Sequence, residues 1–236
     1  MNLQHIAYAD RMRDLRASDI REILKVTQHP EVISFAGGLP ATELLPAAEL
    51  AELARDLLLT DGAKALQYAP TEGMAMLRQL IADRLQDRFG LDRTADDVLV
   101  VSGSQQALDL TGKVFVNDGD VVLCESPTYL GAINAFNAYQ PRYVEVATDD
   151  DGIVVEDLER CLRENDRVKF IYVVPDFQNP SGRTWSLERR RGVMDLVRRY
   201  EVPIVEDCPY AEVRFEGESL PPLKAMEGQE WVIFLG

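Results

Sequence analysis

Hydrophobic and polar residues follow one pattern before about residue 98 and another after it. In the first part, apolar residues recur at helical spacing, which predicts helices at about 10–28, 46–60 and 72–89. Pro46 suits the first turn of the second helix, and Gly90 is a typical stop for the third. The apolar stretch between the first two helices, 33–40, is interrupted by a double glycine, Gly37 and Gly38.

From about residue 98, short runs rich in valine and isoleucine alternate with segments of helical length. The predicted strands are 98–101, 121–124, 143–146, 170–174, 204–206 and 231–235, and the predicted helices are 105–116, 128–138, 155–163 and 187–200. This alternation is typical of an α/β fold with a mostly parallel, buried sheet. Ligands of such sheets bind at the carboxyl ends of the strands, so candidate chemistry is expected there.

Charge and hydropathy narrow the range of partners. A formal net charge of −15 argues against a nucleic-acid surface, which needs clustered lysine and arginine. The basic run Arg189, Arg190 and Arg191 is expected on the solvated face of a helix. No apolar run has the length of a membrane span, and residues 1–14 lack the apolar core of a signal peptide. We therefore expect a cytoplasmic protein that binds neither nucleic acid nor membrane.

Cysteine and histidine are too few and too scattered for a metal centre. The 3 cysteines, Cys124, Cys161 and Cys208, lie far apart and form no C-x-x-C pair. The 2 histidines, His5 and His29, both lie near the N-terminus. We therefore expect no metal and no disulfide framework, and acid–base chemistry must use other groups.

The first strand end carries small and polar residues that could bind a phosphate. Ser102, Gly103, Ser104 and Gln105 follow the predicted strand 98–101 and open a helix. Glycine lets the backbone approach a ligand, and the free N–H groups at a helix start favour an anion. An ordinary serine–glycine turn that caps a helix would have the same composition, so this segment alone leaves both interpretations open.

Later strand ends carry an aromatic ring, an amide and a carboxylate. Tyr129 stands at a helix start, where its ring could stack on a flat cofactor or simply fill the core. Asn179 lies in a rigid turn whose composition also suits plain turn chemistry. Asp207 ends a buried strand, where a carboxylate is costly unless a cation meets it. A protonated ring nitrogen would serve, and the alternative is a helix N-cap.

As a set and in this order, these motifs resemble the fold-type I aminotransferases of class I/II, which depend on pyridoxal 5′-phosphate (PLP). The motifs are Gly103-Ser104-Gln105, Ser126-Pro127-x-Tyr129, Asn179-Pro180-x-Gly182 and Asp207-x-x-Tyr210. Residues 20–25, 34–40 and 66–73 are similar to the subgroup that includes 2-aminoadipate aminotransferase and enzymes acting on kynurenine or branched-chain amino acids. The resemblance implies that 46–236 is an incomplete large PLP-binding domain, its sheet sandwiched by helices. Residues 1–45 would be an N-terminal arm and substrate-covering helix belonging to the small domain.

The resemblance also implies a role for each strand-end residue. Gly103, Ser104 and Gln105 would hold the cofactor phosphate, and Tyr129 would stack on the pyridine ring. Asn179 and Tyr210 would bind the phenolic oxygen of the ring. Asp207 would pair with the ring nitrogen and keep it protonated, which makes the ring an electron sink.

Three residues of the first part acquire roles by the same resemblance. Tyr68 would reach the phosphate of the neighbouring subunit, which implies a homodimer. Gly38 would offer its backbone to the substrate carboxylate, beside Asn179. Arg21, on the substrate-covering helix, could pair with a distal carboxylate of the substrate or remain a solvated helix arginine.

One part of the family pattern has no counterpart in the sequence. The family holds PLP as a Schiff base on a lysine in a Ser-x-Ser-Lys or Thr-x-Ser-Lys turn, which follows a strand like 232–236. Lys224 comes closest but lies in a proline-rich loop. The arginine that binds the α-carboxylate is also absent. We therefore expect the 236-residue chain alone to be inactive, and a serine or threonine soon after Gly236 followed by the Schiff-base lysine.

The implied activity is transfer of an amino group from an amino acid to a 2-oxo acid such as 2-oxoglutarate. The amino acid would be 2-aminoadipate or one of aromatic or branched-chain type. A PLP-dependent lyase and the aminotransferase-like effector domain of a transcription regulator are the alternatives. A nucleotide-binding Rossmann protein is disfavoured because no G-x-G-x-x-G follows the first predicted strand.

Overall fold

The computed structural model describes residues 7–12, 31–33, 38 and 40–236. The chain divides into two compact units, Arg16–Thr71 and a second made of Met1–Leu15 with Glu72–Gly236. The domain boundary expected between residues 45 and 46 stays a prediction. Most of the predicted first helix, including Arg21, lies outside the described residues; its first residues, Asp10–Met12, form the 3₁₀ turn η1.

In the Arg16–Thr71 unit, the 3₁₀ turn η2 (Thr42–Leu44) is followed by helix α2 (Ala47–Ala65). Helix α2 starts one residue after the predicted start, because Pro46 takes the N-cap position rather than a place in the first turn. The helix runs beyond the predicted end at residue 60, with a kink at Asp61 where φ is −138° and ψ is 29°.

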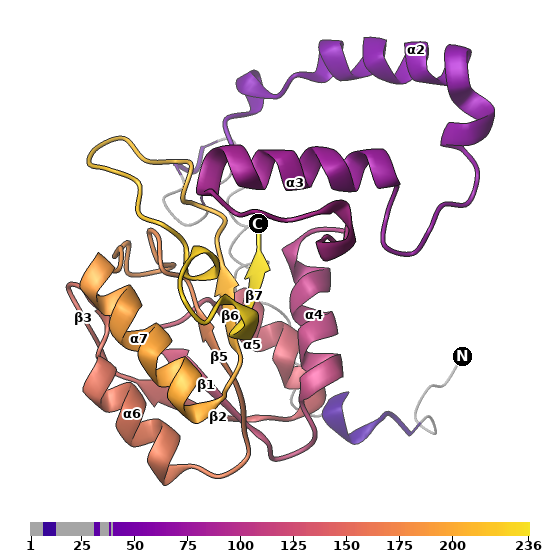
Figure 1. Cartoon of the computed structure of the whole chain (residues 1–236). Coiled ribbons are helices and arrows are strands. Elements are labelled where there is room, and N and C mark those ends of the chain that lie inside the picture. The colour runs from indigo at the N-terminus through magenta and orange to yellow at the C-terminus, as the bar shows by residue number, and fades with distance from the viewer. Residues whose placement is uncertain (1–6, 13–30, 34–37, 39) are drawn as a thin grey trace. The chain divides into compact units, whose positions relative to one another are not determined.

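The second unit contains an α/β sandwich, as the sequence predicted (Figure 1). A five-stranded sheet has the order β2-β1-β5-β6-β7, and every neighbouring pair is parallel. The strands are β1 (Val121–Glu125), β2 (Arg142–Val146), β5 (Val168–Val173), β6 (Ile204–Asp207) and β7 (Val232–Leu235). The helices are α3 (Ala75–Phe89), α4 (Ser104–Phe115), α5 (Leu130–Phe136), α6 (Val155–Glu164) and α7 (Leu187–Tyr200).

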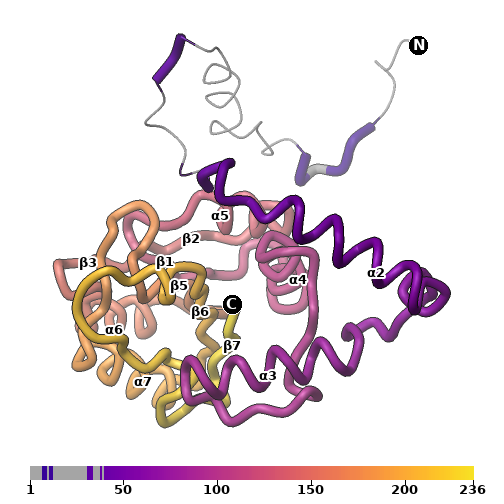
Figure 2. Tube along the Cα trace, turned by 90° about the horizontal axis from the view of Figure 1, so that it is seen from above, coloured from indigo at the N-terminus to yellow at the C-terminus, as the bar shows by residue number. Residues whose placement is uncertain are grey.

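Alternate residues of each central strand enter two different hydrophobic cores. On β1, Val121 and Leu123 pack towards α6 and α7, whereas Val122 packs towards α4 and α5. The two helix layers lie on opposite faces of the sheet, as the view from above shows (Figure 2). Each large apolar side chain buried in this way contributes about 1.5–3 kcal/mol, so both faces stabilise the sheet.

The sequence prediction fails at two places. Residues 98–101 form no strand, so the prediction of a strand there is wrong; Val100 instead donates its N–H to Glu72 O at 3.0 Å. A segment with strand propensity forms a strand only when another segment pairs with it, and no other described segment pairs with these residues. The short hairpin of β3 (Thr148–Asp149) and β4 (Gly152–Ile153) was not predicted, because two-residue strands leave almost no pattern.

Gly152→Ala should lower the free energy of unfolding by about 3 kcal/mol. Gly152 has φ +109°, and a Cβ there would overlap Cδ1 of the Trp185 ring, in the buried core. Gly90→Ala is the matched control, because Gly90 has φ +68° but no atom within 4 Å of the added Cβ. It should cost about 1 kcal/mol. Equal losses in urea unfolding of the two variants would contradict the packing at Trp185.

Candidate functional site

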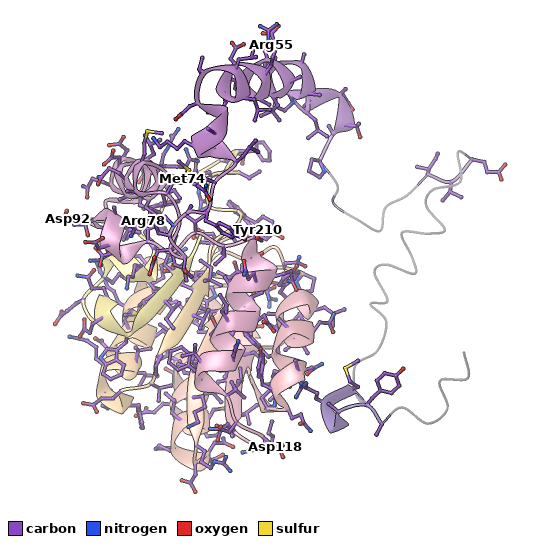
Figure 3. The ribbon with its side chains drawn as sticks, turned by 90° about the vertical axis from the view of Figure 1, so that its right-hand side faces the viewer. Arg55, Met74, Arg78, Asp92, Asp118 and Tyr210 are labelled. Atoms are coloured by element: carbon purple, nitrogen blue, oxygen red, sulfur yellow. The ribbon has the colours of Figure 1, made fainter. Side chains whose placement is uncertain are left out.

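The carboxyl ends of β1, β5 and β6 meet at one edge of the sheet because the three strands are parallel neighbours. Tyr129, Asn179 and Asp207 follow these strands or end them. Tyr210 lies at this end of the strands, and Asp118, which precedes β1, lies at the other (Figure 3). The strand ends therefore bring the predicted cofactor residues of the second unit to one place.

Asn179 and Tyr210 join the two loops that follow β5 and β6. The Asn179 side-chain amide, through Nδ2, donates a hydrogen bond to the Tyr210 hydroxyl at 3.3 Å. Both side chains are partly buried, and the Tyr210 ring packs against the α4–α5 core. Two polar groups that were predicted to bind the same oxygen of a cofactor are thus within reach of each other.

Tyr129 lies beside the same groups. Burial is the main cause that raises the pKa of the Tyr129 phenol, and the nearby Tyr210 and Asp207 raise it further. A hydrogen bond with the Gln105 side chain opposes this rise. The Tyr129 ring lies over Gly131, where an added Cβ would overlap the phenol. Gly131 therefore leaves the room that this tyrosine needs.

Asp207 is a buried carboxylate that has no cation beside it among the described residues. Only 4% of the residue is exposed, and its Oδ2 accepts a hydrogen bond from the Tyr172 hydroxyl at 2.7 Å. Burial raises the pKa of Asp207, the Tyr172 hydrogen bond lowers it, and no described basic side chain contributes. A cation at the free oxygen would stabilise the charged form. The site therefore fits a group with a protonated ring nitrogen.

The start of α4 offers space and backbone donors. Gly103 takes the N-cap position with φ 79° and ψ 168°, and no described side chain caps the helix. A Cβ added to Gly103 would have no atom within 4 Å. The N–H groups of the first helical turn can therefore meet an anion such as a phosphate.

Two buried polar residues that the sequence did not single out hold the loops at this edge. Glu125 accepts hydrogen bonds from Val174 N and Trp185 Nε1, both at 2.9 Å. Gln178 donates from Nε2 to Pro127 O at 2.7 Å and accepts from Ser181 N at 2.8 Å. These bonds tie the β1, β5 and Asn179 segments together.

Arg190 is buried, although the basic run 189–191 was predicted to lie on the solvated face of a helix. It is fully buried, and its guanidinium donates to Asp176 Oδ1 at 2.9 Å and to the carbonyls of Trp185, Pro175 and Pro221. Asp176 also pairs with Arg214 at 3.1 Å. The prediction is wrong for Arg190 because a planar guanidinium can satisfy several buried carbonyls and one carboxylate together. The spacing of the three arginines does not indicate that the middle one, Arg190, is buried.

Other predicted residues belong to the Arg16–Thr71 unit or lie outside the described residues. Tyr68 is 100% exposed and Gly38 is exposed, both in the Arg16–Thr71 unit. Arg21 is outside the described residues. Lys224 donates its ammonium to the carbonyls of Gln229 and Val232, at 3.0 and 2.6 Å, which ties it to the start of β7. The roles of Tyr68, Gly38 and Arg21 stay predictions.

The described residues hold neither a candidate metal cluster nor a helix suited to a membrane. No group of three or more His, Cys, Asp or Glu side chains there could hold a metal ion. None of the helices described is both long enough and apolar enough to span a membrane. Cys124, Cys161 and Cys208 are buried free thiols.

Comparison with known proteins identifies the family to which the chain belongs. Residues 30–236 match the family described as aminotransferase class I and II. The chain is 42% identical over 233 residues to aromatic-amino-acid aminotransferase 1 of Thermococcus litoralis, covering 97% of this chain and 56% of that protein. It is 44% identical over 225 residues to 2-aminoadipate transaminase of Thermus thermophilus, covering 94% and 55%.

A solved structure agrees with these sequence matches. Kynurenine aminotransferase of Pyrococcus horikoshii, crystallised in complex with PMP, superposes with a TM-score of 0.88 at 39% identity, covering 96% of this chain and 57% of that one. The chain thus spans about 56% of the length of the first of these relatives.

Glu125→Gln should flatten the pH dependence of stability between about pH 5 and 7. Burial raises the pKa of Glu125 from 4.5 to about 7, so the unfolded chain loses this proton first as the pH rises. The wild-type free energy of unfolding should therefore fall across this window, by up to about 3 kcal/mol, and glutamine removes that contribution. Urea unfolding at several pH values measures the slope.

The same substitution at exposed Glu216 is the control and should leave the slope unchanged. If Glu125→Gln and wild type lose stability equally as the pH rises, Glu125 does not hold a proton in the folded protein.

Proposed function

The chain belongs to the aminotransferases of class I and II, and on this premise we propose that its protein is a PLP-dependent aminotransferase. It would transfer an amino group from an amino acid to a 2-oxo acid such as 2-oxoglutarate. The family is PLP-dependent, and the observation that carries the proposal for this chain is the buried Asp207, which meets no basic side chain from the part of the chain that the structure describes. Such a carboxylate is costly until a cationic group meets it.

When bound, PLP supplies a protonated pyridine ring that accepts negative charge from the substrate α-carbon. The residues of this chain bind and orient that ring. Asp207 holds the proton on the ring nitrogen, and Tyr129 covers a face of the ring. Asn179 and Tyr210 together bind the phenolic oxygen, an arrangement supported by their hydrogen bond to each other.

The phosphate of the cofactor would lie at the start of α4. Gly103, Ser104 and Gln105 offer backbone N–H groups there, and the helix dipole favours an anion. Tyr68 would reach the phosphate of a neighbouring subunit in a homodimer. Its complete exposure within one chain is compatible with such a contact.

The proposed substrates are 2-aminoadipate and amino acids of aromatic or branched-chain type. Two relatives with 42% and 44% identity are named for aromatic amino acids and for 2-aminoadipate, which supports this range. Gly38 and Asn179 would bind the α-carboxylate side of the substrate. Arg21 would bind a distal carboxylate when the substrate has one.

The test of the reaction type is an amino-group balance. The product of the complete gene, incubated with an amino acid, 2-oxoglutarate and PLP, should form glutamate and the new 2-oxo acid in equal amounts. Release of ammonia without a 2-oxo acceptor would favour the lyase alternative instead. Absence of both reactions, together with effector-dependent DNA binding, would favour the regulator.

Asp207→Ala should lower kcat/KM of the PLP-loaded enzyme by about 100-fold or more, because the ring nitrogen then loses its anionic partner. Asp118→Ala, at an exposed position at the opposite end of the strands, is the control and should change kcat/KM by less than about twofold. Near-normal turnover in folded Asp207→Ala would rule out the role given to this carboxylate.

Arg21→Ala should raise KM for 2-aminoadipate and glutamate by about tenfold while changing KM for leucine by less than about twofold, because only the dicarboxylic substrates offer a distal partner. Leucine is the control within the same enzyme, and Arg21→Lys should recover part of the loss. An equal change for all three substrates would show that Arg21 does not select the substrate.

A further inference from the structure

Tyr172 is a buried tyrosine on β5 whose hydroxyl group points to the candidate site. It has no exposed surface, and its hydroxyl donates to Asp207 Oδ2 at 2.7 Å. The two residues lie on neighbouring parallel strands, with Tyr172 opposite Val205 in the register. The bond therefore links the middle of the sheet to the end of β6.

Aromatic packing fixes the Tyr172 ring. The Phe136 ring meets it edge-on, with centroids 5.7 Å apart and planes at 76°. Phe136 is itself held against Phe170, with centroids 5.1 Å apart. All three side chains are fully buried in the α4–α5 core, so the hydroxyl has little freedom to move.

The hydrogen bond leaves one oxygen of Asp207 free. Tyr172 uses Oδ2, and no hydrogen bond to Oδ1 is found within the described part of the chain. The separation of 2.7 Å is an ordinary length for a hydroxyl that donates to a carboxylate oxygen. Burial raises the pKa of Asp207 and this hydrogen bond opposes the rise, so the hydroxyl favours the charged form.

We propose that Tyr172 is a positioning residue for the cofactor: its hydroxyl fixes the Asp207 carboxylate and leaves Oδ1 for a protonated ring nitrogen. The inference rests on the proposed function, because PLP is the group that would supply this nitrogen. Tyr172 acts only through Asp207, and its effect on cofactor binding disappears when Asp207 is removed.

Tyr143 provides a matched control in the same core. It lies on β2, and its hydroxyl donates to Asn137 Oδ1 at 2.9 Å and to Ile133 O at 3.1 Å. Tyr143→Phe removes a partly buried hydroxyl of the same kind without touching Asp207. The Tyr143→Phe variant therefore shows the effect of losing a hydrogen bond in the core while the bond between Tyr172 and the Asp207 carboxylate is kept.

The test is an equilibrium titration of the apo-protein, made from the complete gene, with pyridoxal 5′-phosphate followed by absorbance. Tyr172→Phe should weaken PLP binding about tenfold, because a hydrogen bond to a charged group is lost. Tyr143→Phe should change the affinity by less than about twofold. In an Asp207→Ala background, adding Tyr172→Phe should also change it by less than about twofold.

Any other result of the titration contradicts either the role of Tyr172 or the proposed function on which it rests. An unchanged affinity in Tyr172→Phe, or a tenfold loss that persists without Asp207, overturns the role of Tyr172. No saturable PLP binding by the wild type, or no effect of Asp207→Ala, contradicts the proposed function instead.

Urea unfolding of the apo-proteins shows whether each variant folds. If Tyr172→Phe unfolds but the double variant folds, the hydroxyl is needed only when the buried carboxylate is present, as proposed. If both unfold while Asp207→Ala folds, Tyr172 supports the core independently of Asp207, and the inference is wrong.

Discussion

Parallel pairing of β1, β5 and β6 is the constraint on which the candidate site depends. Because the strands run in one direction, their carboxyl ends meet at one edge, and each brings one candidate site residue there. Alternation along the strands buries both faces against helices, which fixes the register of every strand end. A one-residue slip of β6 would turn Asp207 away from Tyr172 and bring apolar side chains to the wrong face.

Buried polar groups then hold the loops that carry the site. Glu125 binds the end of β5, and the Arg190–Asp176 pair binds the loop beyond it and the carbonyl of Pro221. Glu206, fully buried beside Asp207 in the chain, accepts hydrogen bonds from Leu223 N and Lys224 N. Removing one partner of the Arg190–Asp176 pair leaves the other as a buried charge, so this pair stabilises a defined loop geometry rather than adding apolar burial.

The sequence predicted the elements whose pattern is local. The ends of most central strands were placed within about two residues, since apolar runs and glycine or proline stops mark them directly. The sequence did not predict that Arg190, Glu125 and Tyr172 are buried and hydrogen-bonded. The partners of these side chains are distant in the chain, so no local pattern indicates the pairing. The segment 98–101 fails for a related reason: its composition favours a strand, but pairing depends on another segment.

The central claim is that these strand ends form one cofactor site, and a crystal structure of the protein grown with PLP tests it most directly. The account predicts the phosphate at the start of α4 beside Gly103 and the ring nitrogen within hydrogen-bonding distance of Asp207 Oδ1. PLP bound elsewhere, or with its ring nitrogen away from Asp207, would contradict it.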